Sequence, residues 1–151
     1  MKTIKINSIN DMKKFGNQIG KSLKGGETIC LQGNLGAGKT HLTQNIGEGM
    51  GIDEYKTSPT FALLNIYNGE INLNHFDTYR LESVEDFEEL GFEDYLFSKD
   101  VNIIEWPDVI FEFLPESPLV IEIEKGAEEV RFINIKTDDE EKYRHILENI
   151  T

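Results

Sequence analysis

The feature that most constrains this chain is the run from Gly33 to Thr40, which has the spacing G-x-x-x-x-G-K-T. This spacing is that of the phosphate-binding loop, or P-loop. Gly36 and Gly38 tolerate backbone angles that let successive N–H groups turn toward phosphates. Lys39 supplies a positive charge for β- and γ-phosphates, and Thr40 a hydroxyl that can ligate Mg²⁺. We therefore expect a nucleotide to be bound by all eight residues: Gly33, Asn34, Leu35, Gly36, Ala37, Gly38, Lys39 and Thr40.

The flanking sequence favours this interpretation over a glycine-rich turn that contains a lysine by chance. Residues 28–31 form a short apolar run typical of a strand. Leu42, Ile46 and Met50 follow at helical spacing, and Gly51 is a stop signal. The order strand, loop, helix is the one that a P-loop requires, and the helix adds its positive dipole end.

Composition predicts one domain over residues 1–151, with 38% hydrophobic and 28% charged residues. No apolar run approaches the roughly 20 residues of a membrane helix, so we expect no membrane contact. The first seven residues lack the apolar core of a secretory signal. Cys30 is the only cysteine, which excludes an internal disulfide and fits a cytoplasmic location. We expect Cys30 to be a small buried hydrophobe.

The formal net charge is −13. A strongly acidic surface opposes unaided binding to nucleic-acid phosphates. An equally open explanation is that the acidity serves solubility. The most acidic stretch lies between Glu82 and Asp94, and it suits either a solvated face or a docking surface for a basic partner.

The remaining patterns predict a three-layer α/β domain like that of P-loop NTPases, with a mixed, mainly parallel sheet and an antiparallel hairpin. Alternating apolar residues predict a strand at 3–6 and a hairpin at 119–124 and 130–136 on a sheet edge. A second hairpin, 62–67 with 71–76, turns at Asn68-Gly69. Residues 101–105 form a buried strand. Helices are expected after the capping residues Ser8, Ser83 and Asp138 or Asp139.

Two carboxylates follow strands downstream of the P-loop. Asp77 ends the strand at 71–76 in the manner of a Walker B acid, and Glu105 ends the next strand before Trp106-Pro107. We expect Lys39, Asp77 and Glu105 to be catalytic, with the choice of the direct Mg²⁺ ligand left open between the two acids. The alternative is that Glu105 is structural and Trp106 packs in the core.

Other candidates have two open roles each. Ser8 is a helix cap or lies near the nucleotide base. The segment 57–61, Thr-Ser-Pro-Thr-Phe, is a polar turn or a segment ordered by the γ-phosphate. Arg80 neutralises phosphate charge or pairs with the acidic stretch.

Four motifs in order resemble the TsaE (YjeE) family, small bacterial P-loop ATPases of tRNA threonylcarbamoyladenosine biosynthesis. They are residues 33–40, the segment 57–61, the H-F-D-T-Y-R-L run at 75–81 and the I-E-W-P run at 104–107. The resemblance covers essentially the whole chain, and its second and third motifs are far more specific than the P-loop.

The resemblance implies ATP and Mg²⁺ as cofactors, with Thr40 and Glu105 holding the metal and Asp77 as the Walker B acid. It also places Ser8 and Thr60 at the nucleotide. The implied partners are the TsaB and TsaD proteins, whose complex modifies adenosine 37 of tRNA and is reset by ATP hydrolysis. Contact with tRNA is then only indirect, and no DNA is involved. The region 125–131 borders the nucleotide in this comparison without a residue-by-residue match.

Two other functions use the same loop. A small-molecule kinase needs an arginine-bearing lid and an acceptor pocket, whereas the arginines here are dispersed at 80, 131 and 144. A GTPase-type switch needs an N-K-x-D segment to bind guanine, and the chain has none.

Overall fold

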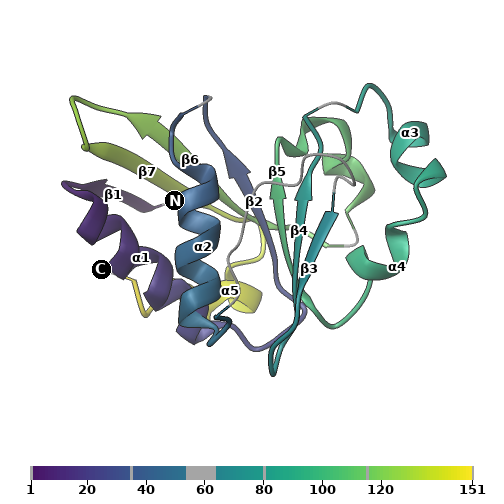
Figure 1. Ribbon diagram of the computed structural model, residues 1–151, viewed down its shortest axis with the longest axis horizontal. Helices are drawn as coiled ribbons and strands as arrows, with labels where there is room; N and C mark the ends of the chain where they lie inside the picture. The colour runs from purple at the N-terminus through teal and green to yellow at the C-terminus, as the bar shows by residue number, and fades with distance from the viewer. Residues whose placement is uncertain (1, 35, 54–63, 80, 115, 151) are drawn as a thin grey trace.

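The computed structural model describes residues 2–34, 36–53, 64–79, 81–114 and 116–150. Figure 1 labels the elements within these ranges. The strands are β1 (Lys2–Ile6), β2 (Thr28–Gln32), β3 (Leu64–Tyr67), β4 (Leu73–Asp77), β5 (Val101–Glu105), β6 (Leu119–Lys125) and β7 (Arg131–Lys136). The helices are α1 (Ile9–Ser22), α2 (Lys39–Gly49), α3 (Val84–Glu89), α4 (Glu93–Leu96) and α5 (Glu140–Leu147), with short 3₁₀ turns η1 (Pro107–Val109) and η2 (Phe111–Phe113).

All of these strands form one sheet in the order β1-β7-β6-β2-β5-β4-β3. The inner strands β6, β2, β5 and β4 pair in parallel. The pairings β6–β7, β1–β7 and β3–β4 are antiparallel. The predicted mixed sheet is therefore confirmed. Its parallel part brings the carboxyl ends of β2, β5 and β4 to the same edge, at the top of Figure 1.

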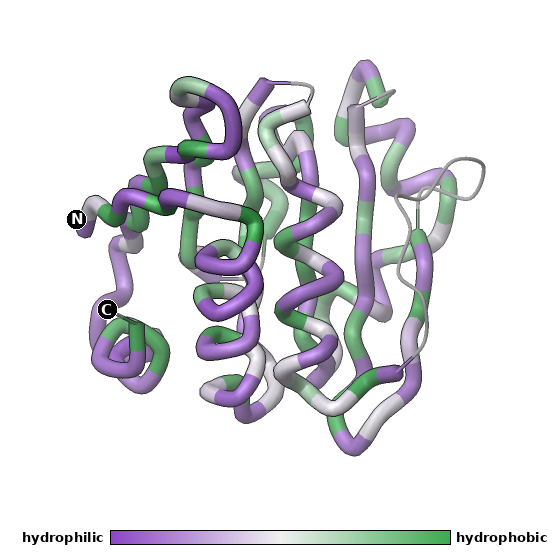
Figure 2. Tube along the Cα trace, turned by 60° about the vertical axis from the view of Figure 1, so that its left-hand side comes forward, coloured by the Kyte–Doolittle hydropathy of each residue, from purple (hydrophilic) through white to green (hydrophobic). Residues whose placement is uncertain are grey.

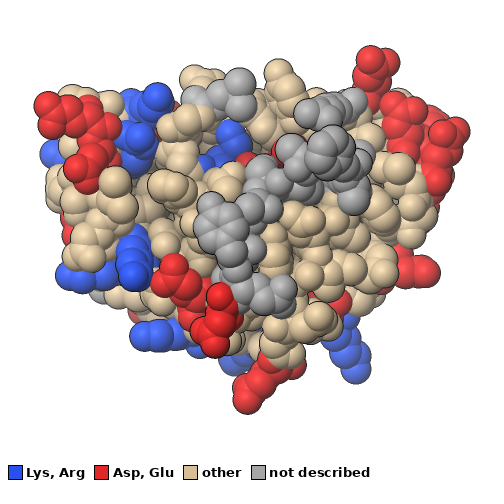
Figure 3. Space-filling model, viewed as in Figure 1, with Lys and Arg blue, Asp and Glu red and all other residues tan. Residues whose placement is uncertain are grey.

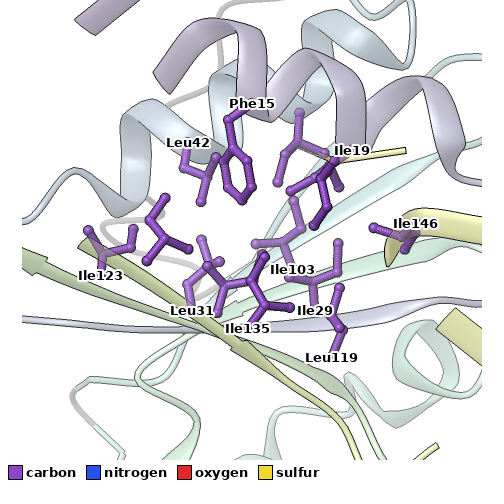
Figure 4. Close-up of a cluster of buried hydrophobic side chains, with 14 of the residues drawn as sticks. Phe15, Ile19, Ile29, Leu31, Leu42, Ile103, Leu119, Ile123, Ile135 and Ile146 are labelled. Atoms are coloured by element: carbon purple, nitrogen blue, oxygen red, sulfur yellow. The ribbon is translucent and has the colours of Figure 1, made fainter. Parts of the chain in front are cut away.

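One face of the sheet is covered by α1, α2 and α5. Phe15 and Ile19 of α1 and Leu42 of α2 point toward sheet residues such as Ile29 and Leu31 (Figure 4). Side chains alternate across a strand, so every second residue of β2 faces this core. The Tyr143 hydroxyl fixes α5 to β2, because it donates to Thr28 O at 3.1 Å and accepts from Thr28 N at 3.2 Å.

The opposite face carries a second apolar cluster beneath α3, α4 and the 3₁₀ turns. Phe76, Ile104 and Cys30 point into it from β4, β5 and β2, and Phe87 of α3 covers them. Cys30 is fully buried, as expected, and burial raises the pKa of its thiol to about 12. Helices on both faces give the three layers that the sequence predicts.

Hydrophobic and hydrophilic residues alternate at short range along the trace (Figure 2). Within the described ranges no helix is long and apolar enough to cross a membrane.

Glycines bring α1 and α2 unusually close together. A Cβ built on Gly20 would lie 2.1 Å from Ile46 O, and one on Gly16 would lie 2.4 Å from Asn45 Cβ. Such distances leave no space for a side chain, so only glycine allows this approach. The amino end of α1 lies near the loop that precedes α2, because Ser8 lines the same cavity as Gly36, Ala37 and Gly38.

Most element predictions are confirmed within one to three residues, and positions 62 and 63 of the strand predicted at 62–67 lie outside the described residues. Ser8 caps α1, since its Oγ accepts from Asp11 N at 3.1 Å, and Ser83 and Asp139 cap α3 and α5. The edge position of the hairpin at 119–136 is wrong. β1 pairs outside β7 and forms the edge instead, which its exposed alternate residues Thr3 and Lys5 permit.

Candidate functional site

A cavity of about 520 Å³ opens where the P-loop, β4 and β5 meet the amino end of α1. Its lining comes from segments far apart in the sequence. The lining residues are Ser8, Ile9, Met12, Gly36, Ala37, Gly38, Lys39, Thr40, His41, Asn45, Asp77, Tyr79, Glu105, Trp106, Glu128, Glu129 and Arg131. A cleft of this size at the carboxyl ends of parallel strands is the usual ligand position in an α/β sheet.

The loop between β2 and α2 has the backbone form that a phosphate cradle requires. Gly36 and Gly38 have φ values of 81° and 108°, in the region that residues with a Cβ avoid. Gly38 is the N-cap of α2, and its carbonyl accepts from Leu42 N at 2.9 Å. The first N–H groups of α2 therefore face the cavity side with no partner in their own helix.

Lys39 lies in the first turn of α2 and is only 6% exposed. Its Nζ donates to Gly33 O at 2.6 Å and to Asn34 O at 3.3 Å, and lies 4.1 Å from the centre of the Trp106 ring. Burial lowers the pKa of Lys39, while the charges of Glu105 and Asp77 oppose that shift. The ammonium group is thus held at the loop, opposite two carboxylates.

The two predicted acids stand side by side. Asp77 and Glu105 are paired residues in the parallel register of β4 and β5, so both carboxylates reach the same edge. Glu105 is only 3% exposed and contacts Nε2 of the buried His75. Asp77 is half-buried, and its Oδ1 accepts from Tyr79 N at 3.1 Å.

Trp106 has an uncommon backbone angle for its residue type. Its φ is 58°, in the left-handed region. Thr78 stabilises this conformation, because its hydroxyl donates to the carbonyls of Glu105 and Trp106. The turn directs the indole ring over Lys39, and the ring of Tyr79 lies 4.9 Å from it, centre to centre. An aromatic wall therefore covers the lysine side of the cavity.

The turn between β6 and β7 forms another wall and connects two parts of the site. Arg131 Nε donates to Ala37 O in the P-loop at 3.0 Å. Glu129 Oε1 accepts from Ile9 N, at the start of α1, at 3.0 Å. Lys125 Nζ lies 3.3 Å from the place where a Cβ on Gly36 would stand. These contacts place the region 125–131 against the loop.

The structure brings together most of the residues that the sequence singles out. Ser8, Gly36, Ala37, Gly38, Lys39, Thr40, Asp77 and Glu105 all line the cavity. Gly33 and Asn34 instead line a smaller hollow on the other side of the loop and reach the site through their carbonyls. Leu35, the segment 57–61 with Thr60, and Arg80 lie outside the described residues.

Sequence reasoning assigned no individual role at the site to several residues that line the cavity or contact its lining. His75 was available from the H-x-D spacing, because residues two apart on a strand share a face. Trp106 was named only as a core residue, and no sequence signal predicts its left-handed turn. Arg131 and Glu129 were expected only as part of the region 125–131 that the resemblance places at the nucleotide, because the sequence does not reveal the sheet order that brings them there.

The oxygen donors in the cavity suit Mg²⁺. Thr40, Asp77 and Glu105 offer one hydroxyl and two carboxylates, and Mg²⁺ prefers oxygen ligands. Among the described residues, no group of three or more His, Cys, Asp or Glu side chains could hold a metal by itself. A site with few carboxylates fits a metal that also takes ligands from phosphates and water.

Comparison with known proteins gives a consistent result. The family model for the threonylcarbamoyl adenosine biosynthesis protein TsaE matches residues 6–133. A tRNA threonylcarbamoyladenosine biosynthesis protein TsaE from Treponema pallidum is 38% identical over 128 residues, covering 85% of this chain and 95% of the relative. The protein of the same name from Bacillus subtilis is 36% identical over 136 residues, covering 88% and 85%.

A crystal structure of Bacillus subtilis YdiB has a TM-score of 0.78 at 29% sequence identity. The match covers 97% of this chain and 91% of that one, so the similarity extends over the whole fold and not only the P-loop. The family model likewise covers both strand-end acids and the turn between β6 and β7. The chain therefore belongs to the TsaE family of threonylcarbamoyl adenosine biosynthesis proteins.

Proposed function

We propose that this protein binds ATP with Mg²⁺ and hydrolyses it, as a component of the machinery that forms threonylcarbamoyladenosine at position 37 of tRNA. The observation that carries the proposal is the convergence of Lys39, Thr40, Asp77 and Glu105 on one cavity beside the glycine loop. The family to which the chain belongs supports the biosynthetic context.

Each residue has a distinct role in this proposal. The N–H groups of residues 36–40 bind the phosphates at the positive end of α2, and Lys39 places its charge beside the β- and γ-phosphates. Thr40 and Glu105 hold the metal, which neutralises phosphate charge when bound. Asp77 orients water or the metal from the adjacent strand. Ser8, just before the amino end of α1, contacts the nucleotide with its hydroxyl. The oxygen of this hydroxyl also accepts a hydrogen bond from Asp11 N.

The partners in this proposal are the TsaB and TsaD proteins. ATP hydrolysis drives or resets their complex. The tRNA binds to the complex, and this chain contacts the tRNA only indirectly. The net charge of −13 supports an indirect contact with tRNA, because an acidic surface repels a polyanion. We also propose that residues 1–151 act as one nucleotide-binding domain in the cytoplasm, without contact to DNA or a membrane.

Phosphate release is the experiment that tests the proposal. The protein is incubated with ATP and Mg²⁺ alone, with TsaB and TsaD, and with TsaB, TsaD and tRNA. We expect slow release by the protein alone, faster release in the complex, and tRNA modification that fails when ADP replaces ATP. Transfer of the γ-phosphate to a small-molecule acceptor, with no release to water, would instead establish the kinase alternative.

A further inference from the structure

His75 lies on β4 between a residue of the apolar core and an acid of the cavity. Side chains alternate along β4, so Leu73, His75 and Asp77 share one face of the sheet while Phe76 points into the opposite cluster. Leu73 belongs to the core and Asp77 to the cavity. His75 lies between them and is fully buried. A fully buried imidazole requires a partner to offset its desolvation.

That partner is Glu105 on the neighbouring strand. His75 is opposite Ile103 in the parallel register, so Glu105 lies two residues further along β5 on the same face. His75 Nε2 contacts Glu105 Oε2 directly. His75 Nδ1 is buried and has no hydrogen-bond partner among the described residues. The imidazole is therefore bound at one nitrogen only.

This arrangement determines which nitrogen carries the proton. A carboxylate accepts, so the shared hydrogen bond requires N–H at Nε2. The hydrogen bond therefore fixes the proton that His75 directs at Glu105. His75 then acts as a single donor directed at one oxygen of Glu105.

We propose that His75 is a positioning residue that holds the Glu105 carboxylate, through Oε2, in the orientation that the metal–nucleotide complex requires. The proposal rests on the function proposed above. Such a donor holds a buried carboxylate with rotatable side-chain bonds in one orientation, and the charge of Glu105 already acts on Lys39, where it opposes the lowering of the pKa by burial. Donors to a metal-binding carboxylate commonly fix its orientation in this way.

Two substitutions separate positioning from simple packing. In His75→Gln the side-chain amide can still donate from nearly the place of Nε2, whereas His75→Leu keeps bulk and removes the donor. ATP binding is measured by calorimetry across a Mg²⁺ series and again in EDTA, with thermal unfolding as a check on folding. We expect His75→Leu to raise the half-saturating Mg²⁺ concentration at least about tenfold, a change of roughly 1.4 kcal/mol, while ATP affinity in EDTA stays the same. His75→Gln recovers most of the loss.

A second measurement needs neither nucleotide nor a variant of His75. Long-range proton–nitrogen NMR correlation of the ¹⁵N-histidine-labelled protein reports the tautomer, and His41→Gln and His145→Gln assign the other two rings. We expect His75 to carry a proton at Nε2.

The inference is overturned by an Nε2 that carries no proton, by wild-type Mg²⁺ dependence in a folded His75→Leu variant, or by equal defects in the Gln and Leu variants. If wild-type protein shows no Mg²⁺-dependent ATP binding, the proposed function fails. In that case the NMR measurement, which needs no nucleotide, still tests whether His75 donates to Glu105.

Discussion

In the proposed function, Lys39 is the residue on which nucleotide binding depends most directly. Its Nζ is already held at the P-loop carbonyls and beneath Trp106, so it reaches the phosphates without a large rearrangement. A charge-assisted contact contributes roughly 1.5–3 kcal/mol. We predict that Lys39→Ala weakens ATP binding by about 10- to 150-fold in calorimetric titration with Mg²⁺. Lys14→Ala, an exposed position on α1, is the control for the change in charge. Unchanged affinity in Lys39→Ala would remove the lysine from the site.

The paired acids predict a different outcome, because the proposed function has them act on the metal and the water. We expect Asp77→Asn and Glu105→Gln each to reduce hydrolysis by more than about tenfold, which corresponds to roughly 1.4 kcal/mol in the barrier. One of the two variants should mainly shift the Mg²⁺ dependence, and that shift identifies the direct ligand. Glu88→Gln, exposed on α3, serves as the control. An acid whose replacement leaves turnover intact at every Mg²⁺ concentration has only a structural role.

Among the elements, the hairpin β6–β7 supports the P-loop from outside. Arg131 donates to Ala37 O from Nε and to Glu128 O and Val130 O from Nη1, so one guanidinium joins the turn to the loop. We predict that Arg131→Ala weakens ATP binding about three- to tenfold, with Arg131→Lys little better, since an ammonium group lacks the planar fork. Titration calorimetry measures both, and Arg144→Ala on α5 is the matched control. Full affinity in Arg131→Ala would show that the loop keeps its shape unaided.

The glycine contact between α1 and α2 gives a prediction about stability. Gly20→Ala would place a Cβ 2.1 Å from Ile46 O, so the two helices must move apart. We expect a loss of about 1–3 kcal/mol in unfolding free energy, the usual cost of overpacking, measured by denaturant titration. The neighbouring Lys21→Ala introduces the same residue at an exposed position and should be nearly neutral. Equal stability of the two variants would contradict the close approach of the helices.

Elements with a clear local signal were predictable, whereas their assembly was not. The P-loop, the cap at Ser8 and the turn at Asn68-Gly69 each depend on residues a few positions apart. The order of strands depends on contacts between distant segments, so the sequence did not reveal that β1 lies outside β7. α4 and the 3₁₀ turns have only three or four residues, too few to show a period. The cavity wall made by Arg131 and Glu129 follows from the sheet order and was predictable only as a region.

At the scale of the whole molecule, charge limits the direct partners. Asp and Glu side chains gather over α3 at the right of Figure 3, and the chain carries a net −13. Each phosphate contact by a cation contributes to nucleic-acid affinity, and this surface supplies few of them. We predict that the protein alone binds tRNA no more tightly than about 10⁻⁴ M at physiological salt, the weak end of non-specific binding. A filter-binding titration measures this. Micromolar binding that weakens steeply with salt would assign the tRNA contact to this chain.

The last prediction concerns the link between nucleotide and partner proteins. If ATP changes the surface that this protein presents to TsaB and TsaD, then linkage requires those partners to change its affinity for ATP by the same factor. We expect ATP to bind about 5- to 150-fold more tightly in the complex than to the protein alone, the usual range of such coupling, with a smaller effect for ADP. Calorimetry with each nucleotide, with and without the partners, measures the factor, and sedimentation measures complex formation in parallel. Lys39→Ala is the control, because a variant that cannot use the γ-phosphate should assemble equally with ATP and ADP. Assembly of the wild-type protein that ignores the nucleotide would separate ATP hydrolysis from the partner complex.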